Sequence, residues 1–459
     1  MTSFDPAPLP DVPVPDQTER VILRAAEEEG GTGCPCDLIV LGDSTGALTA
    51  AALELVAAQP EAKVWSRGTS RAHSAALARL LPGPLAAGQL VLPTGDDPVP
   101  LEEFAAGAEA HLVLARLPKS LAALEDLARR LAVLAARGGR EDLALVAGGR
   151  IKHMTRSQND VLATAFAEVR GSRGLGKSRA LIASAPRPET TIAEPVPGRA
   201  TVTVRGQRRE LSLRGVGGVF GGARPDAGSL LLVDALDAAL LSEEIVTAHA
   251  EEFDATGTGP GAGAVPAAGP GAAVDLGCGN GLLTAYLAAA LPGARVLGSD
   301  DDADAVSATR ATLAASRLDR DGVEVAWDES LSQVAEGSVD LVVLNPPFHD
   351  GTVVDATLVQ GLLDAAVRVL RPGGQLWFVH NSHLRYRGEV EARFPQVRQR
   401  ARDRRFTVLS AVAGRGTRDA GESGEASSDA HDGGEGSSDD RGRRAGLSSR
   451  RSRPARVRF

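Results

Sequence analysis

The second half of the chain contains the segment Ala273-Val274-Asp275-Leu276-Gly277-Cys278-Gly279-Asn280-Gly281-Leu282-Leu283-Thr284-Ala285. An apolar run leads here into a glycine-rich turn, and a second apolar run follows. This pattern is typical of a buried strand, a tight turn and a helix, the first unit of a parallel α/β sheet. The turn lacks the Lys-Ser/Thr pair of a phosphate-binding P-loop. It therefore indicates a nucleotide-binding α/β domain of another kind.

The first half of the chain repeats this segment. The repeat reads Leu38-Ile39-Val40-Leu41-Gly42-Asp43-Ser44-Thr45-Gly46-Ala47-Leu48-Thr49-Ala50. Both copies contain Leu-Gly, a later glycine and Leu-Thr-Ala, and further downstream Glu61-Ala62-Lys63-Val64 matches Gly293-Ala294-Arg295-Val296. Duplication of a whole domain is the simplest explanation. We therefore predict an α/β protein with two tandem doubly wound, Rossmann-like domains.

The spacing of apolar residues predicts further elements. Short apolar runs alternate with helical patterns, which favours parallel strands joined by crossover helices. The predicted helices are Leu121–Ala136 and Leu230–Leu241, and the predicted strands are Leu38–Leu41, His111–Leu114, Leu143–Val146, Ala272–Leu276, Arg295–Ser299, Val323–Trp327, Val339–Leu344 and Gln375–His380.

The expected domain limits follow from composition. A chain of 459 residues is long enough for two or three domains. We expect a flexible amino terminus over residues 1–17, a first α/β domain over 18–200 and a second over 201–413. Residues 254–272 are dominated by Gly, Ala, Pro and Thr, which predicts an insertion in the second domain. Residues 414–459 carry an acidic block and then a basic block, and we expect a disordered tail.

Composition excludes several classes of protein. Hydrophobic residues make up 43% of the chain and charged residues 24%, as in soluble globular proteins. No window reaches about 18 consecutive apolar residues, and the Pro- and Asp-rich start lacks the layout of a signal peptide. We therefore expect a cytoplasmic protein without a membrane partner. Cys34, Cys36 and Cys278 suit neither a disulfide framework nor a zinc site, so we expect reduced thiols and no metal.

The net charge of -9 is unevenly distributed. Between residues 385 and 405, eight arginines stand against three acids, which gives a local charge of +5. Such a basic strip can bind phosphate although the whole chain is acidic. The alternative is a solvated, arginine-rich surface. The candidate RNA-binding arginines are Arg385, Arg387, Arg402, Arg404 and Arg405.

Three acids lie at the ends of three successive predicted strands. Asp275 leads into the glycine turn, Asp300 ends the next strand, and Asp328 follows the one after. Ligands of an open parallel sheet bind beyond the carboxyl ends of its strands. The three acids can therefore pair with an ammonium group, ribose hydroxyls and an adenine amino group. This set favours S-adenosylmethionine over NAD, whose fingerprint has the spacing G-x-G-x-x-G.

The predicted cofactor site draws on the turn and on the strand ends around it. Its candidate residues are Asp275, Gly277, Cys278, Gly279, Asn280, Gly281, Asp300, Asp301, Asp328 and Asn345. Phe220 and the turn at residues 226–229 precede a predicted helix and could cover the cofactor.

The fourth predicted strand of the second half leads into Asn345-Pro346-Pro347-Phe348. The Asn345 side-chain oxygen and the Pro346 carbonyl can accept the two hydrogens of an exocyclic amine, so that its lone pair faces the methyl donor. The prolines have fixed φ angles and hold that carbonyl in place, and Phe348 can stack on a base. We therefore predict methyl transfer to a planar amino nitrogen, with these four residues as the catalytic set. A proline-rich turn with Phe348 in the core is the alternative.

The first copy lacks both features. Ser66 and Arg67 stand where the second copy has the acids around Asp300, and residues 115–119 stand where it has the segment that begins at Asn345. The amino-terminal copy is therefore expected to keep the scaffold without the cofactor and the catalytic loop.

Over about residues 18–413 the chain resembles the ribosomal RNA (guanine-N2)-methyltransferases with tandem methyltransferase domains. The stretches that carry the resemblance are Leu117-Pro118-Lys119-Ser120-Leu121, Gly148 to Thr155, Gly218 to Leu232, Asp275 to Gly281, Asn345 to His349 and Asn381 to Tyr386. The first-half stretches look most like the large-subunit branch. The glycine-rich insertion and the charged tail depart from the family pattern.

The resemblance implies a degenerate first domain that aids RNA binding or folding. It implies that the second domain transfers methyl from S-adenosylmethionine to guanine N2 in ribosomal RNA or in a subunit assembly intermediate. His349 is then a candidate for RNA contact. Two alternatives stay open: a methyltransferase acting on adenine N6 or on a protein glutamine, and a non-catalytic RNA-binding or assembly factor.

Overall fold

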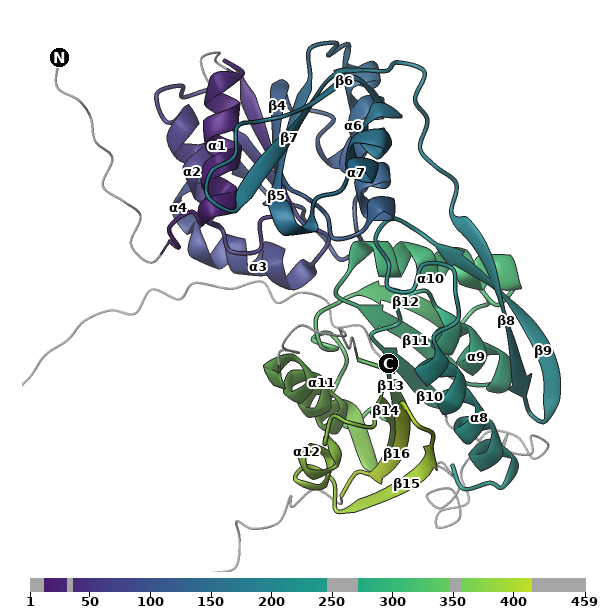
Figure 1. The fold of residues 1–459 in the computed structure, drawn as a ribbon. Coiled ribbons are helices and arrows are strands. Elements are labelled where there is room, and N and C mark those ends of the chain that lie inside the picture. Colours follow the sequence, from purple (N-terminus) through teal and green to yellow (C-terminus); the bar gives the residue numbers. More distant parts are fainter. Residues whose placement is uncertain (1–11, 31–35, 246–270, 347–355, 415–459) are drawn as a thin grey trace, which may run out of the picture.

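The computed structural model describes residues 12–30, 36–245, 271–346 and 356–414. They form two α/β domains, each built on a seven-stranded sheet. The amino-terminal domain lies above the carboxy-terminal domain in Figure 1, and the hairpin β8–β9 runs along one side of the latter. The prediction of two tandem Rossmann-like domains is confirmed.

The strand order of the amino-terminal sheet is β3-β2-β1-β4-β5-β7-β6. Its strands are β1 (Asp37–Leu41), β2 (Val64–Arg67), β3 (Leu90–Val91), β4 (Ala110–Arg116), β5 (Ala144–Arg150), β6 (Phe166–Gly171) and β7 (Ser178–Pro186). The helices of this domain are α1 (Gln17–Glu28), α2 (Ala47–Val56), α3 (Arg71–Leu80), α4 (Pro82–Ala86), α5 (Leu101–Phe104), α6 (Leu121–Gly138) and α7 (Arg156–Ala163).

The carboxy-terminal sheet has the equivalent order, β12-β11-β10-β13-β14-β16-β15. Its strands are β10 (Ala272–Leu276), β11 (Arg295–Asp300), β12 (Val323–Trp327), β13 (Val339–Leu344), β14 (Leu370–Asn381), β15 (Gln396–Arg402) and β16 (Phe406–Val412). The helices are α8 (Ala227–Leu241), α9 (Leu282–Ala290), α10 (Ala303–Ser316), α11 (Ala356–Val369) and α12 (Arg387–Glu391).

The two sheets match in detail. In each, five strands pair in parallel, and the sixth strand in the order, β7 or β16, pairs antiparallel with both of its neighbours. Leu41 at the end of β1 pairs with Ala115, and Leu276 at the end of β10 pairs with Leu344. Arg116 and Asn345, the next residues in the chain, are therefore equivalent. The prediction of parallel strands holds for β1–β5 and β10–β14 but missed the antiparallel pair that ends each sheet.

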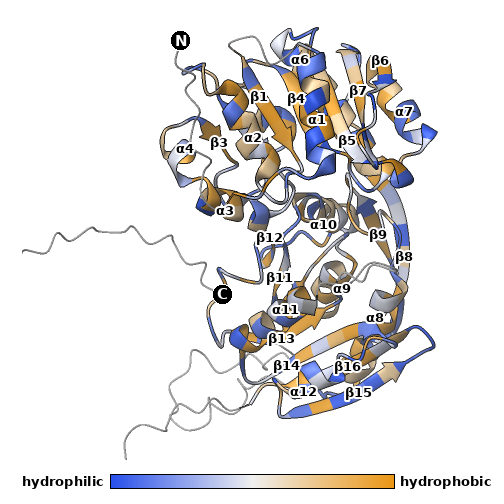
Figure 2. Cartoon of the chain, turned by 60° about the vertical axis from the view of Figure 1, so that its left-hand side comes forward, coloured by the Kyte–Doolittle hydropathy of each residue, from blue (hydrophilic) through white to orange (hydrophobic). Residues whose placement is uncertain are grey.

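Each sheet is buried between two layers. In the amino-terminal domain, α1, α2 and α3 cover one face, and α5, α6 and α7 cover the other. In the carboxy-terminal domain, α8, α9 and the hairpin β8 (Val196–Val204)–β9 (Gln207–Gly215) cover one face, and α11 and α12 cover the other. Figure 2 shows largely hydrophobic central strands beside helices that carry hydrophilic stretches. Strands buried on both faces explain the continuous apolar runs in the sequence.

Two expected limits differ from the structure. The helix α1 begins at Gln17, and the side chain of Asp16 caps it, so ordered structure starts before residue 18. The strand β8 begins at Val196, and residues of its hairpin pack into the carboxy-terminal core. Most of the predicted insertion, and the whole tail after residue 414, lie outside the described residues. None of the described helices has the length and hydropathy needed to cross a membrane.

Candidate functional site

The carboxyl ends of β10, β11, β12 and β13 lie at one edge of the second sheet. Parallel pairing brings Leu276 next to Ser299 on one side and next to Leu344 on the other. Asp300 pairs with Trp327, the residue before Asp328. The predicted cofactor residues and Asn345 therefore share one edge, where an open sheet binds its ligands.

The glycines of the turn have two different roles. Gly277 and Gly279 have φ angles of +82° and +54°, and a Cβ atom added to either would meet no heavy atom within 4 Å. A Cβ on Gly281, whose φ is +82°, would lie 2.9 Å from the Cα of Thr309. Gly277 and Gly279 therefore leave open space beside the backbone. Gly281 is required for the close packing of α9 against α10.

The side chains of Cys278 and Asn280 contact the protein itself. The Cys278 sulfur is buried and accepts a hydrogen bond from the Thr309 hydroxyl, 3.2 Å away. The Asn280 amide donates to the carbonyls of Gly222 (3.0 Å) and Arg224 (2.9 Å). These two residues can reach a cofactor only through their backbone. The cysteine prediction needs a correction, because Cys36 is disulfide-bonded rather than a reduced thiol.

Asp275 is fully buried below the turn. Its Oδ2 accepts a hydrogen bond from the Thr284 hydroxyl at 2.6 Å, whereas its Oδ1 has no partner among the described residues. The pKa of Asp275 is raised to about 7, mainly by burial; the hydrogen bond from Thr284 opposes this rise, and the nearby Asp300 carboxylate contributes to it. A buried carboxylate oxygen without a partner is costly. A cationic ligand at this place would stabilise the ionised form.

The carboxylates of Asp300 and Asp328 accept hydrogen bonds from different parts of the domain. Asp300 accepts hydrogen bonds from the backbone N–H groups of Gly279 and Asp302, both at 2.9 Å, and burial raises its pKa. Asp328 accepts from the Ser332 hydroxyl and from the Gln333 N–H. Asp300 therefore braces the glycine turn, and the carboxylate of Asp328 supports the segment after β12.

Asp301 belongs to the contact between the domains. Its carboxylate accepts hydrogen bonds from the Ser70 hydroxyl (2.5 Å) and the Ala72 N–H (2.7 Å) at the start of α3. The indole N–H of Trp327 donates to the Asp301 carbonyl at 2.7 Å, and the guanidinium of Arg71 lies 5.7 Å from the Trp327 ring centroid. The amino-terminal domain thus holds the loop that carries Asp300, and the side chain of Asp301 is engaged there.

Asn345 follows β13 and contacts the start of α8. Its Nδ2 donates to a carboxylate oxygen of Asp226 at 2.9 Å and lies 2.8 Å from the Ser229 hydroxyl oxygen. Pro346 is buried after it. Pro347, Phe348 and His349 lie outside the described residues. The turn at 226–229, predicted only as a cover for the cofactor, is thus in direct contact with a predicted catalytic residue.

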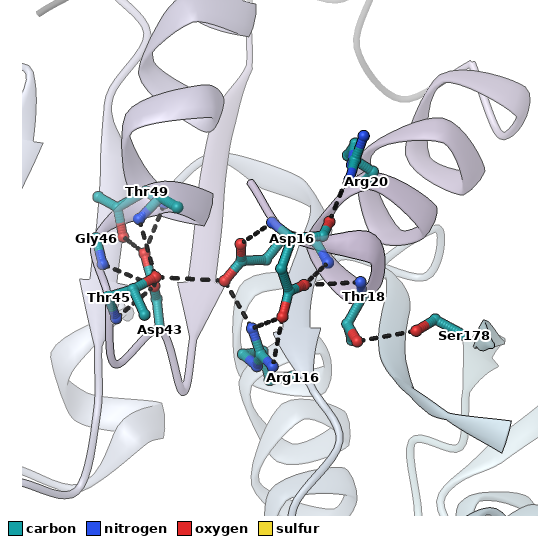
Figure 3. Close-up of polar contacts among 11 residues, drawn as sticks. Asp16, Thr18, Arg20, Asp43, Thr45, Gly46, Thr49, Arg116 and Ser178 are labelled. Atoms are coloured by element: carbon teal, nitrogen blue, oxygen red, sulfur yellow. Dashed lines mark hydrogen bonds and ion pairs between the residues drawn. The ribbon is translucent and has the colours of Figure 1, made fainter. Parts of the chain in front are cut away.

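The equivalent place in the amino-terminal domain is filled by its own side chains (Figure 3). Arg116 forms ion pairs with Glu19 (2.7 Å) and Asp16 (3.3 Å) at the start of α1. Asp43, in the turn, accepts hydrogen bonds from the N–H groups of Gly46 (2.9 Å) and Thr49 (2.8 Å). These contacts agree with the expectation that this copy does not use the cofactor.

The predicted arginine strip divides into two parts. Arg385, Arg402, Arg404 and Arg405 are exposed beyond Asn381, the last residue of β14, at the same edge as Asn345. Other arginines of the strip are ion-paired: Arg387 with Glu391, Arg393 with Asp364 and Glu389, and Arg400 with Glu244. Only the first part borders the site.

The residues at this edge fit S-adenosylmethionine. The space beside Gly277 and Gly279 admits a ligand, the Asp275 Oδ1 atom lacks a partner for an ammonium group, and Asp300 ends β11 next to the turn. No group of three or more potential metal-ligating side chains occurs within the described ranges.

The fold and the site define a class I methyltransferase carried on duplicated domains. A family model described as methyltransferase small domain matches residues 210–410, and one described as RLMG N-terminal domain matches residues 16–188. The chain belongs to the ribosomal RNA large subunit methyltransferase G family. It is 32% identical to the family member of Pseudomonas aeruginosa (strain UCBPP-PA14), over 86% of this chain and 92% of that protein.

Other relatives agree with this assignment. The ribosomal RNA large subunit methyltransferase G of Streptomyces coelicolor is 31% identical over 82% of this chain and 88% of its own length. Among solved structures, the T. thermophilus 16S rRNA N2 G1207 methyltransferase, in complex with AdoMet and guanosine, has a TM-score of 0.60. That match covers 87% of this chain and 92% of the other at 22% identity, so it supports the fold.

Proposed function

We propose that the protein transfers a methyl group from S-adenosylmethionine to the exocyclic N2 amino group of one guanine in large-subunit ribosomal RNA. The observation that carries this proposal is the placement of Asn345 at the ligand-binding edge, with its amide nitrogen already bound to Asp226 and Ser229. Its side-chain oxygen then remains for the substrate. Membership of the family and the complex of the T. thermophilus protein with AdoMet and guanosine support the same reaction.

The residues of this chain act mainly by positioning. The Asn345 side-chain oxygen and the Pro346 carbonyl accept the two hydrogens of the guanine amino group and direct its lone pair. When bound there, S-adenosylmethionine would supply an electrophilic methyl group to that lone pair. The nitrogen then loses one proton to solvent, because neither carbonyl is a base at neutral pH. Asp275 and Asp300 would hold the donor.

The substrate is expected to be naked or partly assembled ribosomal RNA, in the cytoplasm. A guanine in a helix must be turned out of the stack to reach the site, at a cost of a few kcal/mol. Pro347 and Phe348 complete the proposed catalytic set, and His349 contacts the RNA. Equal methylation of mature subunits and of deproteinised RNA would contradict this choice of substrate.

Asn345→Ala is the decisive variant. Turnover should fall at least about 100-fold, because the amino group loses an acceptor that orients it. The affinity for S-adenosylmethionine, measured by calorimetry, should stay nearly unchanged. The control is Asn159→Ala, an exposed asparagine on α7 in the other domain. Nucleoside mass spectrometry should detect N2-methylguanosine; N6-methyladenosine would point to the adenine alternative, and near-normal turnover of the variant would contradict the role of Asn345.

The exposed arginines beside the site should contact RNA phosphates. Arg402→Gln combined with Arg404→Gln should weaken RNA binding and reduce the slope of log affinity against log salt by about 2, because each phosphate contact releases about one counterion. Arg398→Gln is the matched control, since Arg398 lies on β15 opposite Ser410, away from Asn381. The control removes one charge and the test variant removes two, so a change half as large in the control would assign the effect to overall charge.

A further inference from the structure

We propose that Asp226 and Ser229 are positioning residues that fix the Asn345 side chain as a hydrogen-bond acceptor toward the target amine. The inference rests on the proposed methyl transfer and explains how its central group is oriented. The two residues belong to the segment before β10, more than a hundred positions from Asn345 in the chain. Neither is proposed to touch the substrate or the reacting atoms.

The orientation of the Asn345 amide follows from the chemistry of its neighbours. The Asp226 carboxylate can only accept hydrogen bonds, so the group 2.9 Å from it must be the amide nitrogen. The same nitrogen lies 2.8 Å from the Ser229 hydroxyl oxygen. Its two hydrogens are therefore both used, and the oxygen is the polar atom left for a ligand. Rotating the amide by 180° would set its oxygen against a carboxylate, which is repulsive.

The two holding groups lie on a rigid element. Asp226 is the N-cap of α8, and the oxygen that contacts Asn345 also accepts from the Ser229 N–H at 2.9 Å. Ser229 is buried, and Gly228 between them packs closely on Phe406: a Cβ there would lie 3.1 Å from the ring. The start of α8 thus has little freedom to move. An amide bound to it has a fixed orientation before any substrate arrives.

The amino-terminal domain contains an equivalent arrangement of hydrogen-bonded side chains (Figure 3). There Asp16 is the N-cap of α1, Glu19 is the third residue of that helix, and both bind Arg116. Arg116 is equivalent to Asn345, because the residues before them pair with equivalent residues of β1 and β10. An aspartate cap and the third helical residue therefore hold equivalent residues at the carboxyl end of the fourth strand in both domains: Arg116, the last residue of β4, and Asn345, which follows β13. Only in the second does that residue keep an oxygen for a ligand.

Two substitutions separate this role from helix capping. Ser229→Ala removes one acceptor and keeps the backbone N–H that Asp226 caps. Asp226→Ser keeps a good N-cap residue but is too short to reach Asn345. We expect turnover to fall about 2- to 10-fold for the first, which loses a neutral hydrogen bond, and about 10- to 100-fold for the second, which loses a charge-assisted one. The affinity for S-adenosylmethionine should not change.

A second measurement does not depend on activity. The two side-chain amide protons of Asn345 should exchange slowly with solvent. Their signals can be assigned in nitrogen-15 NMR spectra because they are absent from the spectrum of Asn345→Ala. Exchange should accelerate in both variants. The matched control is Ser242→Ala at the other end of α8. Among the described residues, its hydroxyl bonds within its own turn and with Glu244, so exchange and turnover should stay unchanged.

The combination with Asn345→Ala decides how the two residues act. In that background Ser229→Ala should cause no further loss of turnover, because its effect passes through the missing amide. The inference would be overturned if Ser229→Ala lowered turnover by the same factor in the Asn345→Ala background as in the wild-type protein. It would also be overturned if the amide protons exchanged at the wild-type rate in both single variants. If the wild-type protein methylates no guanine, the proposed function fails, whereas the exchange measurement still reports whether Asp226 and Ser229 hold the amide.

Discussion

At the scale of single residues, the buried carboxyl group of Asp275 makes cofactor binding dependent on pH. Its raised pKa of about 7 means that the free protein binds a proton there that an unfolded chain releases near pH 4. This contribution to stability is present at low pH and is lost as the pH rises through 7. Binding of a cationic ammonium beside the Asp275 Oδ1 would favour the ionised carboxylate over the protonated one, so that the proton is released.

We therefore expect the affinity for S-adenosylmethionine to rise about fivefold between pH 6 and pH 7, below the pH at which the ligand's own α-ammonium loses its proton. Calorimetry in buffers of different ionisation enthalpy should detect release of up to one proton at pH 6. Asp275→Asn should bind more weakly and without the pH dependence. If the wild-type affinity is flat over this range, Asp275 does not face the ammonium group.

The adjacent acids Asp300 and Asp301 show which side-chain contacts the sequence alone could not predict. Asp300 and Asp301 are adjacent, and both were predicted to bind the cofactor. Asp300 braces the glycine turn, whereas the Asp301 carboxylate caps α3 of the other domain. Successive side chains at a strand end point in different directions. The partner of Asp301 is 229 residues away, so no local pattern could identify it.

At the scale of elements, the glycine turn offers a comparison within one loop. Gly281→Ala should lower the free energy of unfolding by about 1–3 kcal/mol or more, because the left-handed backbone is strained and the new Cβ meets the Thr309 backbone at 2.9 Å. Gly277→Ala has the same left-handed backbone strain, but its new Cβ would meet no neighbouring atom. It should be less destabilised but should lose affinity for the cofactor, since its Cβ enters the open space.

Chemical denaturation and calorimetry on both variants would measure the two effects. Equal destabilisation, or a greater loss of cofactor affinity in Gly281→Ala than in Gly277→Ala, would contradict the division of roles within the turn.

Elements buried on both faces were predicted most accurately. The strand predicted at Ala272–Leu276 has the bounds of β10, because a continuous apolar run identifies a central parallel strand. The strand β15, Gln396–Arg402, was interpreted only as part of a basic strip. It lies at the edge of the sheet and carries three arginines in seven residues, so its sequence has no apolar run. The hairpin β8–β9 was missed for a similar reason: polar residues fill much of both strands.

At the scale of the whole molecule, the contact between the domains supports the cofactor loop. Asp301→Ala removes the acceptor of two hydrogen bonds from α3 and should lower the free energy of unfolding by about 1–3 kcal/mol. It should also weaken cofactor binding, because Asp300 is in the same loop. Asp319→Ala, an exposed aspartate after α10, is the matched control. Normal cofactor affinity in Asp301→Ala would show that the loop holds its shape without the Asp301 carboxylate.

The ion pairs of Arg116 have a consequence for the history of the duplication. Replacing Arg116 with asparagine alone would leave the carboxylates of Asp16 and Glu19 without their cation, facing each other across a partly buried space. Glu19 is almost completely buried, so such a change should destabilise the domain. A return to activity would require several simultaneous substitutions, including one at Asp43 in the turn. Selection can therefore tune this half of the molecule as a scaffold, but single mutations do not lead it back to an enzyme.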